Sequence, residues 1–175
     1  KGIYRANLFL EKIDGIEDAS EAFRTRTKGE AKFLRAKFYF DLVRLFGNVP
    51  LIDHTLGASE YYTVEQVGPD QIYPLIISDL EDAIAVLPSS VSSNQLGRVT
   101  KGAAQALLAR ALLFENDENN MSQVASLCES VIQSGEYSLF TSFADLWTAD
   151  GEWSSESVFE ITYSENSASD WGSFG

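Results

Sequence analysis

The chain has 175 residues, 45% hydrophobic and 22% charged, which is enough apolar material for one compact unit and excludes a disordered or collagen-like chain. Its 26 acidic and 13 basic side chains give a formal net charge of −13. This charge repels a phosphate backbone, so we do not expect nucleic acid as a partner. The apolar runs fall well short of the roughly 20 residues that a membrane-spanning helix needs.

The first helices are predicted from apolar spacing. Helical periodicity runs from Gly2 to Ile13 and again from Thr27 to Phe46. Thr27 and Glu30 match a capping box, which predicts that the second helix begins at Thr27. Gly47 then supplies the left-handed residue that ends a helix. Two apolar stripes on this helix predict that it packs between two other helices. One stripe consists of Ala31, Leu34, Phe38, Leu42 and Leu45, and the other consists of Phe33, Ala36, Phe40 and Val43.

Three further helices and a strand follow. Apolar residues from Ile72 to Leu87 predict a helix, in which Pro74 is tolerated because it lies near the first turn, where amides lack intrahelical acceptors. Thr100 caps an alanine-rich helix, whose Ala104 and Ala109 are expected to lie buried where helices approach closely. A fifth helix is predicted from about Ser122 to Gly135. The alternation in 158–163 predicts a short strand.

Two segments of the chain resemble each other. Thr-Lys-Gly occurs at Thr27 and again at Thr100, an offset of 100 − 27 = 73 residues, and the offset also pairs Ala31 with Ala104 and Leu34 with Leu107. Repeated helix pairs that bury a face on the next pair are typical of helical solenoids. The predicted fold is therefore mainly α, an irregular tetratricopeptide-like α-α superhelix of two or three antiparallel pairs with a short strand near the C-terminal end.

Five blocks of this sequence resemble the SusD/RagB family. In chain order they are "GEAKFLRAKFYFDLVRLFGNVPLI", "ISDLEDAIAVLP", "GRVTKGAAQALLARALLF", "VIQSGEYSL" and "ESVFEITY". The resemblance implies a tetratricopeptide-like helical fold. It also implies a non-enzymatic, lipid-anchored protein on the outer face of the outer membrane. Such a protein delivers oligosaccharide to a TonB-dependent transporter.

The ends of the chain predict how it is organised. Lys1 enters a helical pattern without a methionine or a signal peptide, and the last residues stop in loop composition. We expect an internal fragment that forms one domain over 1–175. Helix pairs are expected over 1–135, and a loop and strand region over 136–175 that leads into a further C-terminal part. The lipidated N-terminus would lie outside these residues.

Catalytic and metal sites have little support in the sequence. His54 is the only histidine, and no nucleophile motif accompanies it. Glu152 and Glu156 form a pair of acids, but a glycosidase needs a defined separation across a cleft. The acidic run 115–120 lacks the glycine and final glutamate of a calcium loop. Cys128, the only cysteine, lies on an apolar stripe and is expected to be buried. We expect no cofactor, no metal and no catalytic residues.

Aromatic residues in polar loops are the candidates for sugar contacts, because sugar C–H patches pack on exposed rings. Trp171 in "NSASDWGSFG" is the leading candidate, with Asp170 and Phe174 beside it; the alternative is that Trp171 packs under residues beyond this chain. Weaker candidates are Tyr61, Tyr62 and Trp153. The aromatics expected in the core or in packing are Phe33, Phe38, Tyr39, Phe40, Phe46, Phe114 and Trp147.

Two other functions fit the helix pairs. One is a tetratricopeptide-like adaptor that binds a peptide in a concave groove, and the other is a family member with peptide cargo, since a fold does not fix its ligand. A signal peptide followed by a lipidated cysteine in the full-length protein would favour the surface receptor.

Overall fold

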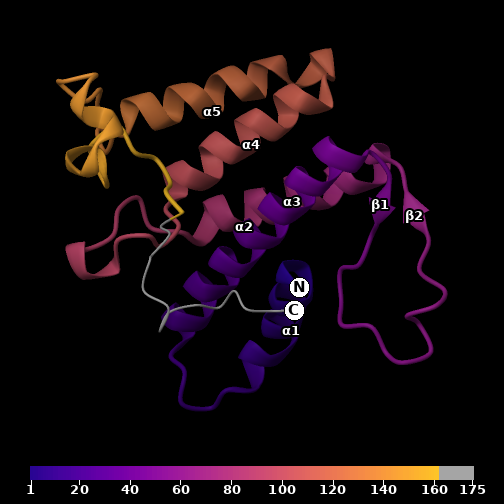
Figure 1. The fold of residues 1–175 in the computed structure, drawn as a ribbon. Helices are drawn as coiled ribbons and strands as arrows, with labels where there is room; N and C mark the ends of the chain where they lie inside the picture. Colours follow the sequence, from indigo (N-terminus) through magenta and orange to yellow (C-terminus); the bar gives the residue numbers. More distant parts are fainter. Residues whose placement is uncertain (162–175) are drawn as a thin grey trace.

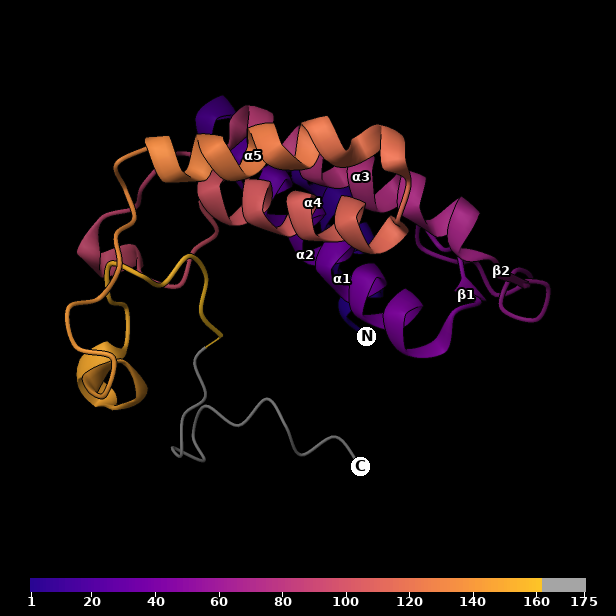
Figure 2. The same ribbon diagram turned by 90° about the horizontal axis from the view of Figure 1, so that it is seen from above.

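The structure is a computed structural model that describes residues 1–161, and helices dominate it (Figure 1). Each helix packs on the helices that precede and follow it in the chain. Seen from above, the helices lie side by side along a common direction (Figure 2). The helices are α1 (Gly2–Lys12), α2 (Glu21–Phe46), α3 (Pro69–Val86), α4 (Lys101–Glu115) and α5 (Met121–Gln133). This order confirms the predicted mainly α fold of paired helices.

Two short strands and several 3₁₀ turns complete the described part. Strands β1 (Val49–Pro50) and β2 (Gln66–Val67) are antiparallel, with Val49 opposite Val67. The 3₁₀ turns span Ile13–Gly15, Ser93–Gln95, Glu118–Asn120, Asp145–Trp147 and Ala149–Gly151. No helix among residues 1–161 is both long and apolar enough to cross a bilayer.

The start of α2 differs from the prediction. The helix begins at Glu21, and the Ser20 hydroxyl caps it by accepting a hydrogen bond from the amide of Phe23 at 3.2 Å. Thr27 is a buried residue inside the helix, and its hydroxyl donates to the carbonyl of Phe23 at 2.7 Å. Glu30 does not close a capping box, because its carboxylate binds Arg98 at 2.8 Å. The capping box at Thr27 is therefore wrong.

The other helix boundaries agree more closely with the sequence. Thr100 caps α4, and its hydroxyl accepts from the amide of Ala103 at 3.3 Å. Gly47 ends α2 with φ +69° and ψ −94°, a positive φ as predicted but outside the left-handed helical region. Pro74 lies in the second turn of α3, since that helix begins at Pro69; it is near the first turn as predicted, but past the amides that lack intrahelical acceptors.

The core lies where α2, α3 and α4 meet. Its largest members are Phe33, Tyr39, Phe40, Ile72, Ile76, Leu80, Leu108 and Leu112. Of the two stripes on α2, the one that includes Phe33, Ala36, Phe40 and Val43 is buried. Leu34, Phe38 and Leu45 of the other stripe are exposed. Leu34 and Phe38 line an open groove beside α1, which covers them only in part.

Several predicted core residues lie at the surface. Phe46 and Phe114 are 69% and 52% exposed, since both stand at helix ends, where Phe114 packs one side of its ring against Phe40. Trp147 is 75% exposed and contacts only the edge of Phe143 among the aromatic rings described. Cys128 is exposed, because α5 covers the outside of the bundle and packs through Val124 and Leu127 instead. These four expectations of burial are wrong.

The repeated Thr-Lys-Gly has a structural reason in its glycine. A Cβ on Gly29 of α2 would lie 2.5 Å from the side chain of Val86, at the end of α3. A Cβ on Gly102 of α4 would lie 2.5 Å from the ring of Tyr137, just beyond α5. In each copy the glycine therefore leaves room for a side chain at, or just after, the end of the following helix. The start of α4 thus corresponds to the matching part of α2, and the two helices are equivalent members of successive pairs.

The predicted strand near the C-terminal end is not formed in its described part. Residues 158–161 have no strand conformation, and the rest of 158–163 lies outside the described residues. A strand requires a partner for its backbone groups, and the structure pairs only β1 with β2 among residues 1–161. Phe159 instead packs its ring edge-on against Phe33 at 5.1 Å.

Candidate functional site

The described candidate residues lie at two opposite ends of the helices. Tyr61 and Tyr62, which are 59% and 96% exposed, are on the loop between β1 and β2. Trp153 is on the segment that follows α5, at the other end of the helices (Figures 1 and 2). The structure therefore does not bring Trp153 together with the tyrosines. Asp170, Trp171 and Phe174 lie outside the described residues.

Trp153 is half-buried and has a local packing partner. Its φ is +56°, which a non-glycine residue rarely adopts. Its amide donates to Glu160 Oε1 at 2.9 Å. The indole lies against the turn at Gly97, where an added Cβ would be 3.1 Å from the ring. The contact fixes Trp153 against the 3₁₀ turn before α4 and leaves only part of its ring available.

The loop that carries the two tyrosines is attached to a buried ion pair. Arg35 of α2 and Asp79 of α3 pair through two hydrogen bonds, Nε to Oδ2 at 2.7 Å and Nη2 to Oδ1 at 2.8 Å. Both side chains are buried. Arg35 Nη1 also donates to the carbonyl of Asp53 at 2.9 Å and to Asn7 Oδ1 at 2.9 Å. One guanidinium therefore links three helices to the base of the loop.

The remaining backbone groups at the base of the loop have side-chain partners too. Asn7 Nδ2 donates to the carbonyls of Ile52 and His54 at 3.0 and 2.9 Å. The Tyr39 hydroxyl donates to the Ile52 carbonyl at 2.9 Å and accepts from the Ile52 amide at 2.6 Å. Glu11 accepts from both the amide and the hydroxyl of Thr55, each at 2.6 Å. Residues 52–55 therefore have a fixed backbone path.

The hydrogen-bond partners in this network shift the pKa values of its ionisable side chains. Burial acts against the charge on Arg35, but hydrogen bonding and attraction to Asp79 outweigh it, so the pKa of the guanidinium is raised. Burial also raises the pKa of the Tyr39 hydroxyl. The pKa of Glu11 is lowered by its hydrogen bonds from Thr55. Arg35 therefore stays charged and Tyr39 stays neutral near neutral pH.

Sequence reasoning missed this network, although a signal was present. Asp79 falls on the apolar face of α3, three residues after Ile76 and four before Ala83. Arg35 falls in the same way on the buried face of α2, between Ala31 and Tyr39. Opposite charges on the buried faces of consecutive helices indicate a buried pair, because an unpaired charge there is costly.

His54 lies at the exposed start of the same loop. Its Nδ1 is 2.8 Å from Asp53 Oδ1 and its Nε2 is 3.4 Å from Glu60 Oε1. Glu60 Oε2 also accepts from the Gly57 amide at 2.7 Å. The hydrogen bond with Asp53, and then that with Glu60, raise the pKa of His54 above its ordinary 6.5. His54 therefore joins the base of the loop to its tip.

We expect this contact to depend on pH. A raised pKa means that the folded loop favours the imidazolium, so the full contact is present below the unfolded value of 6.5. It is lost as the pH rises through the higher folded value. NMR titration of the His54 ring, assigned with His54→Gln, should give a midpoint above 6.5. Glu60→Gln should lower that midpoint and Glu17→Gln should not; a midpoint at or below 6.5 in the unaltered protein contradicts the contact.

Two of the acids considered for catalysis or metal binding, Glu156 and Asp117, have structural partners. Glu156 Oε2 accepts from the amide of Phe140 at 2.9 Å. Asp117 caps the turn at Glu118–Asn120 by accepting from the amide of Asn119 at 3.0 Å. Within residues 1–161, no group of three or more His, Cys, Asp or Glu side chains is arranged to hold a metal ion.

Comparison with known proteins identifies the family. A model of SusD-like proteins, described as "Starch-binding associating with outer membrane", matches residues 1–113. The chain belongs to the SusD-like family. SusD-like protein P25 of Formosa agariphila is 28% identical over 164 residues, which make up 94% of this chain and 31% of the relative.

Solved structures of surface glycan-binding proteins share the fold. Surface glycan-binding protein A from Bacteroides uniformis is 36% identical with a TM-score of 0.86, over 92% of this chain and 36% of that chain. Surface glycan-binding protein A from Bacteroides thetaiotaomicron, in complex with laminarihexaose, is 31% identical with a TM-score of 0.82, over 92% of this chain and 33% of that chain. The chain thus spans about a third of the length of these relatives.

Proposed function

We propose that the protein containing this chain is a cell-surface glycan-binding subunit that captures oligosaccharides for uptake and does not cleave them. The observation that carries the proposal is the fold shared with a laminarihexaose-bound surface glycan-binding protein. The family description, starch-binding and associated with the outer membrane, supports the same ligand class and location. Glucans are therefore the first ligands to test.

The family membership also supports a partner and an anchor. A TonB-dependent, SusC-like transporter would receive the oligosaccharide, and an N-terminal lipid outside this chain would hold the protein at the outer membrane. In this arrangement the helix pairs act as a scaffold, and the ligand contacts come from loops.

Within this chain, two loops are proposed to contribute sugar contacts. One is the loop with Tyr61 and Tyr62, whose exposed rings stand on a backbone fixed by Arg35 and Asn7. The other is the segment with Asp170, Trp171 and Phe174, where a large aromatic is set among small and polar residues. Trp153 contributes less, because Gly97 covers part of its ring.

Aromatic truncation tests these contacts. In the full-length protein, Trp171→Ala and Tyr62→Ala should each weaken binding of laminarihexaose by on the order of 1–3 kcal/mol, by analogy with other stacking contacts on aromatic rings. The melting temperature should stay nearly unchanged. Isothermal titration calorimetry provides the affinities.

Trp147→Ala is the matched control, since this tryptophan is 75% exposed and lies outside both loops. Its affinity should equal that of the unaltered protein. Unchanged affinity in Trp171→Ala, or a large fall in its melting temperature, would assign Trp171 to packing. Tight binding of a peptide with no response to any glucan would instead support peptide cargo.

A further inference from the structure

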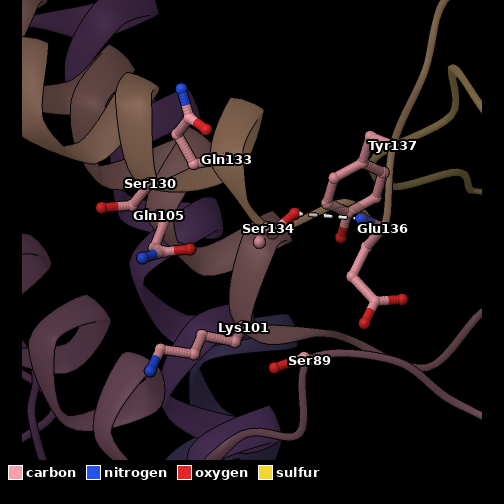
Figure 3. Close-up of a pocket in the computed structure, with 9 residues that line it drawn as sticks. Ser89, Lys101, Gln105, Ser130, Gln133, Ser134, Glu136 and Tyr137 are labelled. Carbon is pink, nitrogen blue, oxygen red and sulfur yellow. Dashed lines mark hydrogen bonds between the residues drawn. The ribbon is translucent and has the colours of Figure 1, made fainter.

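A polar pocket lies between the start of α4 and the end of α5, away from the tyrosine loop. Its volume is about 350 Å³, within the roughly 300–1,000 Å³ of small-molecule sites. Figure 3 shows that Lys101 and Gln105 come from α4, Ser130 and Gln133 from α5, and Tyr137 from the segment that leaves α5. Helix α4, helix α5 and the segment after α5 therefore each form one wall of the pocket.

The pocket contains polar groups without partners. Among residues 1–161, no side-chain hydrogen bond or ion pair is formed by Lys101, Gln105 or Gln133. Tyr137, by contrast, is held in place, because its hydroxyl shares a hydrogen bond of 2.9 Å with Thr100 and its ring lies over Gly102. A fixed aromatic ring thus stands beside two carboxamides and an ammonium group that are available to a ligand.

The first helix pair has ion pairs at the equivalent positions. The residues 73 positions earlier than Lys101 and Gln105 are Lys28 and Lys32 of α2. Lys28 is paired with Asp14 at 2.6 Å, and Lys32 is paired with Asp82 of α3. In the second pair, Lys101 and Gln105 form no side-chain hydrogen bond or ion pair within residues 1–161, although the glycine contact is kept. The two copies therefore differ in the pairing of these side chains, and the free polar groups belong to the second copy only.

The lining favours a neutral ligand with hydroxyl groups. Lys101 is the one cation and Glu136 the one anion among its residues, so their charges balance. The carboxamides of Gln105 and Gln133 each donate and accept, as do the hydroxyls of Ser89 and Ser130. Sugar hydroxyls also donate and accept, and the Tyr137 ring offers an apolar surface for sugar C–H groups.

We propose that the pocket lined by Lys101, Gln105, Gln133 and Tyr137 is a second sugar-binding subsite that takes one neutral glycosyl unit. The inference rests on the proposed glycan-binding function and adds a place for it on the helical scaffold. Because the pocket and the tyrosine loop lie at opposite ends of the helices, the two sites would bind separate sugar units.

Hydrogen exchange on the full-length protein tests the subsite, with laminaribiose and maltose as probes. Either disaccharide should slow amide exchange in peptides covering 101–106 and 130–138, and titration of this protection gives an apparent dissociation constant. Gln105→Ala/Gln133→Ala should raise that constant roughly tenfold or more, because each carboxamide loses its hydrogen bonds to the sugar. Gln71→Ala, an exposed glutamine of α3, is the control and should leave it unchanged.

Binding of laminarihexaose, measured on the same samples, distinguishes failure of the subsite from failure of the glycan-binding function. If the hexaose binds and neither disaccharide protects 101–106 and 130–138, the subsite is wrong and the glycan-binding function stands. The subsite is also wrong if the double variant and Gln71→Ala keep the same protection. If no saccharide binds at all, the proposed function fails and the subsite fails with it.

Discussion

Replacing Asp79 with alanine should destabilise the protein by about 3–5 kcal/mol, the cost typical of breaking a buried ion pair by removing one partner. The substitution leaves the buried Arg35 without its carboxylate, and Arg35 also carries the contacts to Asn7 and to the Asp53 carbonyl. Chemical denaturation, analysed for the free energy of unfolding, measures the loss.

The matched control is Asp41→Ala, which breaks partly solvent-exposed pairs with Lys37 and Arg44, each within one helical turn. Exposed pairs contribute about 0–1 kcal/mol, so this variant should unfold close to the unaltered protein. If Asp79→Ala were no more destabilising than Asp41→Ala, the buried network would not hold the fold. Arg35 would then not determine the path of residues 52–55.

Replacing Ala109 with leucine should destabilise the protein by about 1–3 kcal/mol through overpacking. Ala109 is 4% exposed on α4, which packs on both α3 and α5, so three added carbons have no free space to enter. Thermal unfolding should show a lower melting temperature. Ala125→Leu is the control because Ala125 is exposed on α5, and leucine is nearly as good a helix former as alanine. Equal melting of the two variants would contradict the close approach of helices at Ala109.

Patterns that depend on one helix at a time were the most predictable part of this fold. Spacing and caps such as Thr100 located all five described helices, and the repeat at 73 residues identified which helices are equivalent. The start of α2 was missed because the apolar pattern in 21–26 is weak, whereas the Ser20 cap lies outside the periodic segment.

Features that depend on neighbouring elements were predicted less well. Phe46 and Phe114 follow core periodicity, but the helices that would cover them end too early. Arg35 and Asp79 meet across two helices, and their pairing required the register of α2 against α3. The tyrosine loop and Trp153 were both candidates by composition, while their separation follows only from the three-dimensional path of the chain.

The most direct test of the account is a calorimetric titration of the full-length protein with laminarihexaose and maltohexaose, followed by chromatography of the titrated mixture. A surface glycan-binding subunit should bind at least one of the two saturably and return it at its original length. Absence of binding to either, or recovery of shortened saccharides, would contradict a non-catalytic glycan receptor.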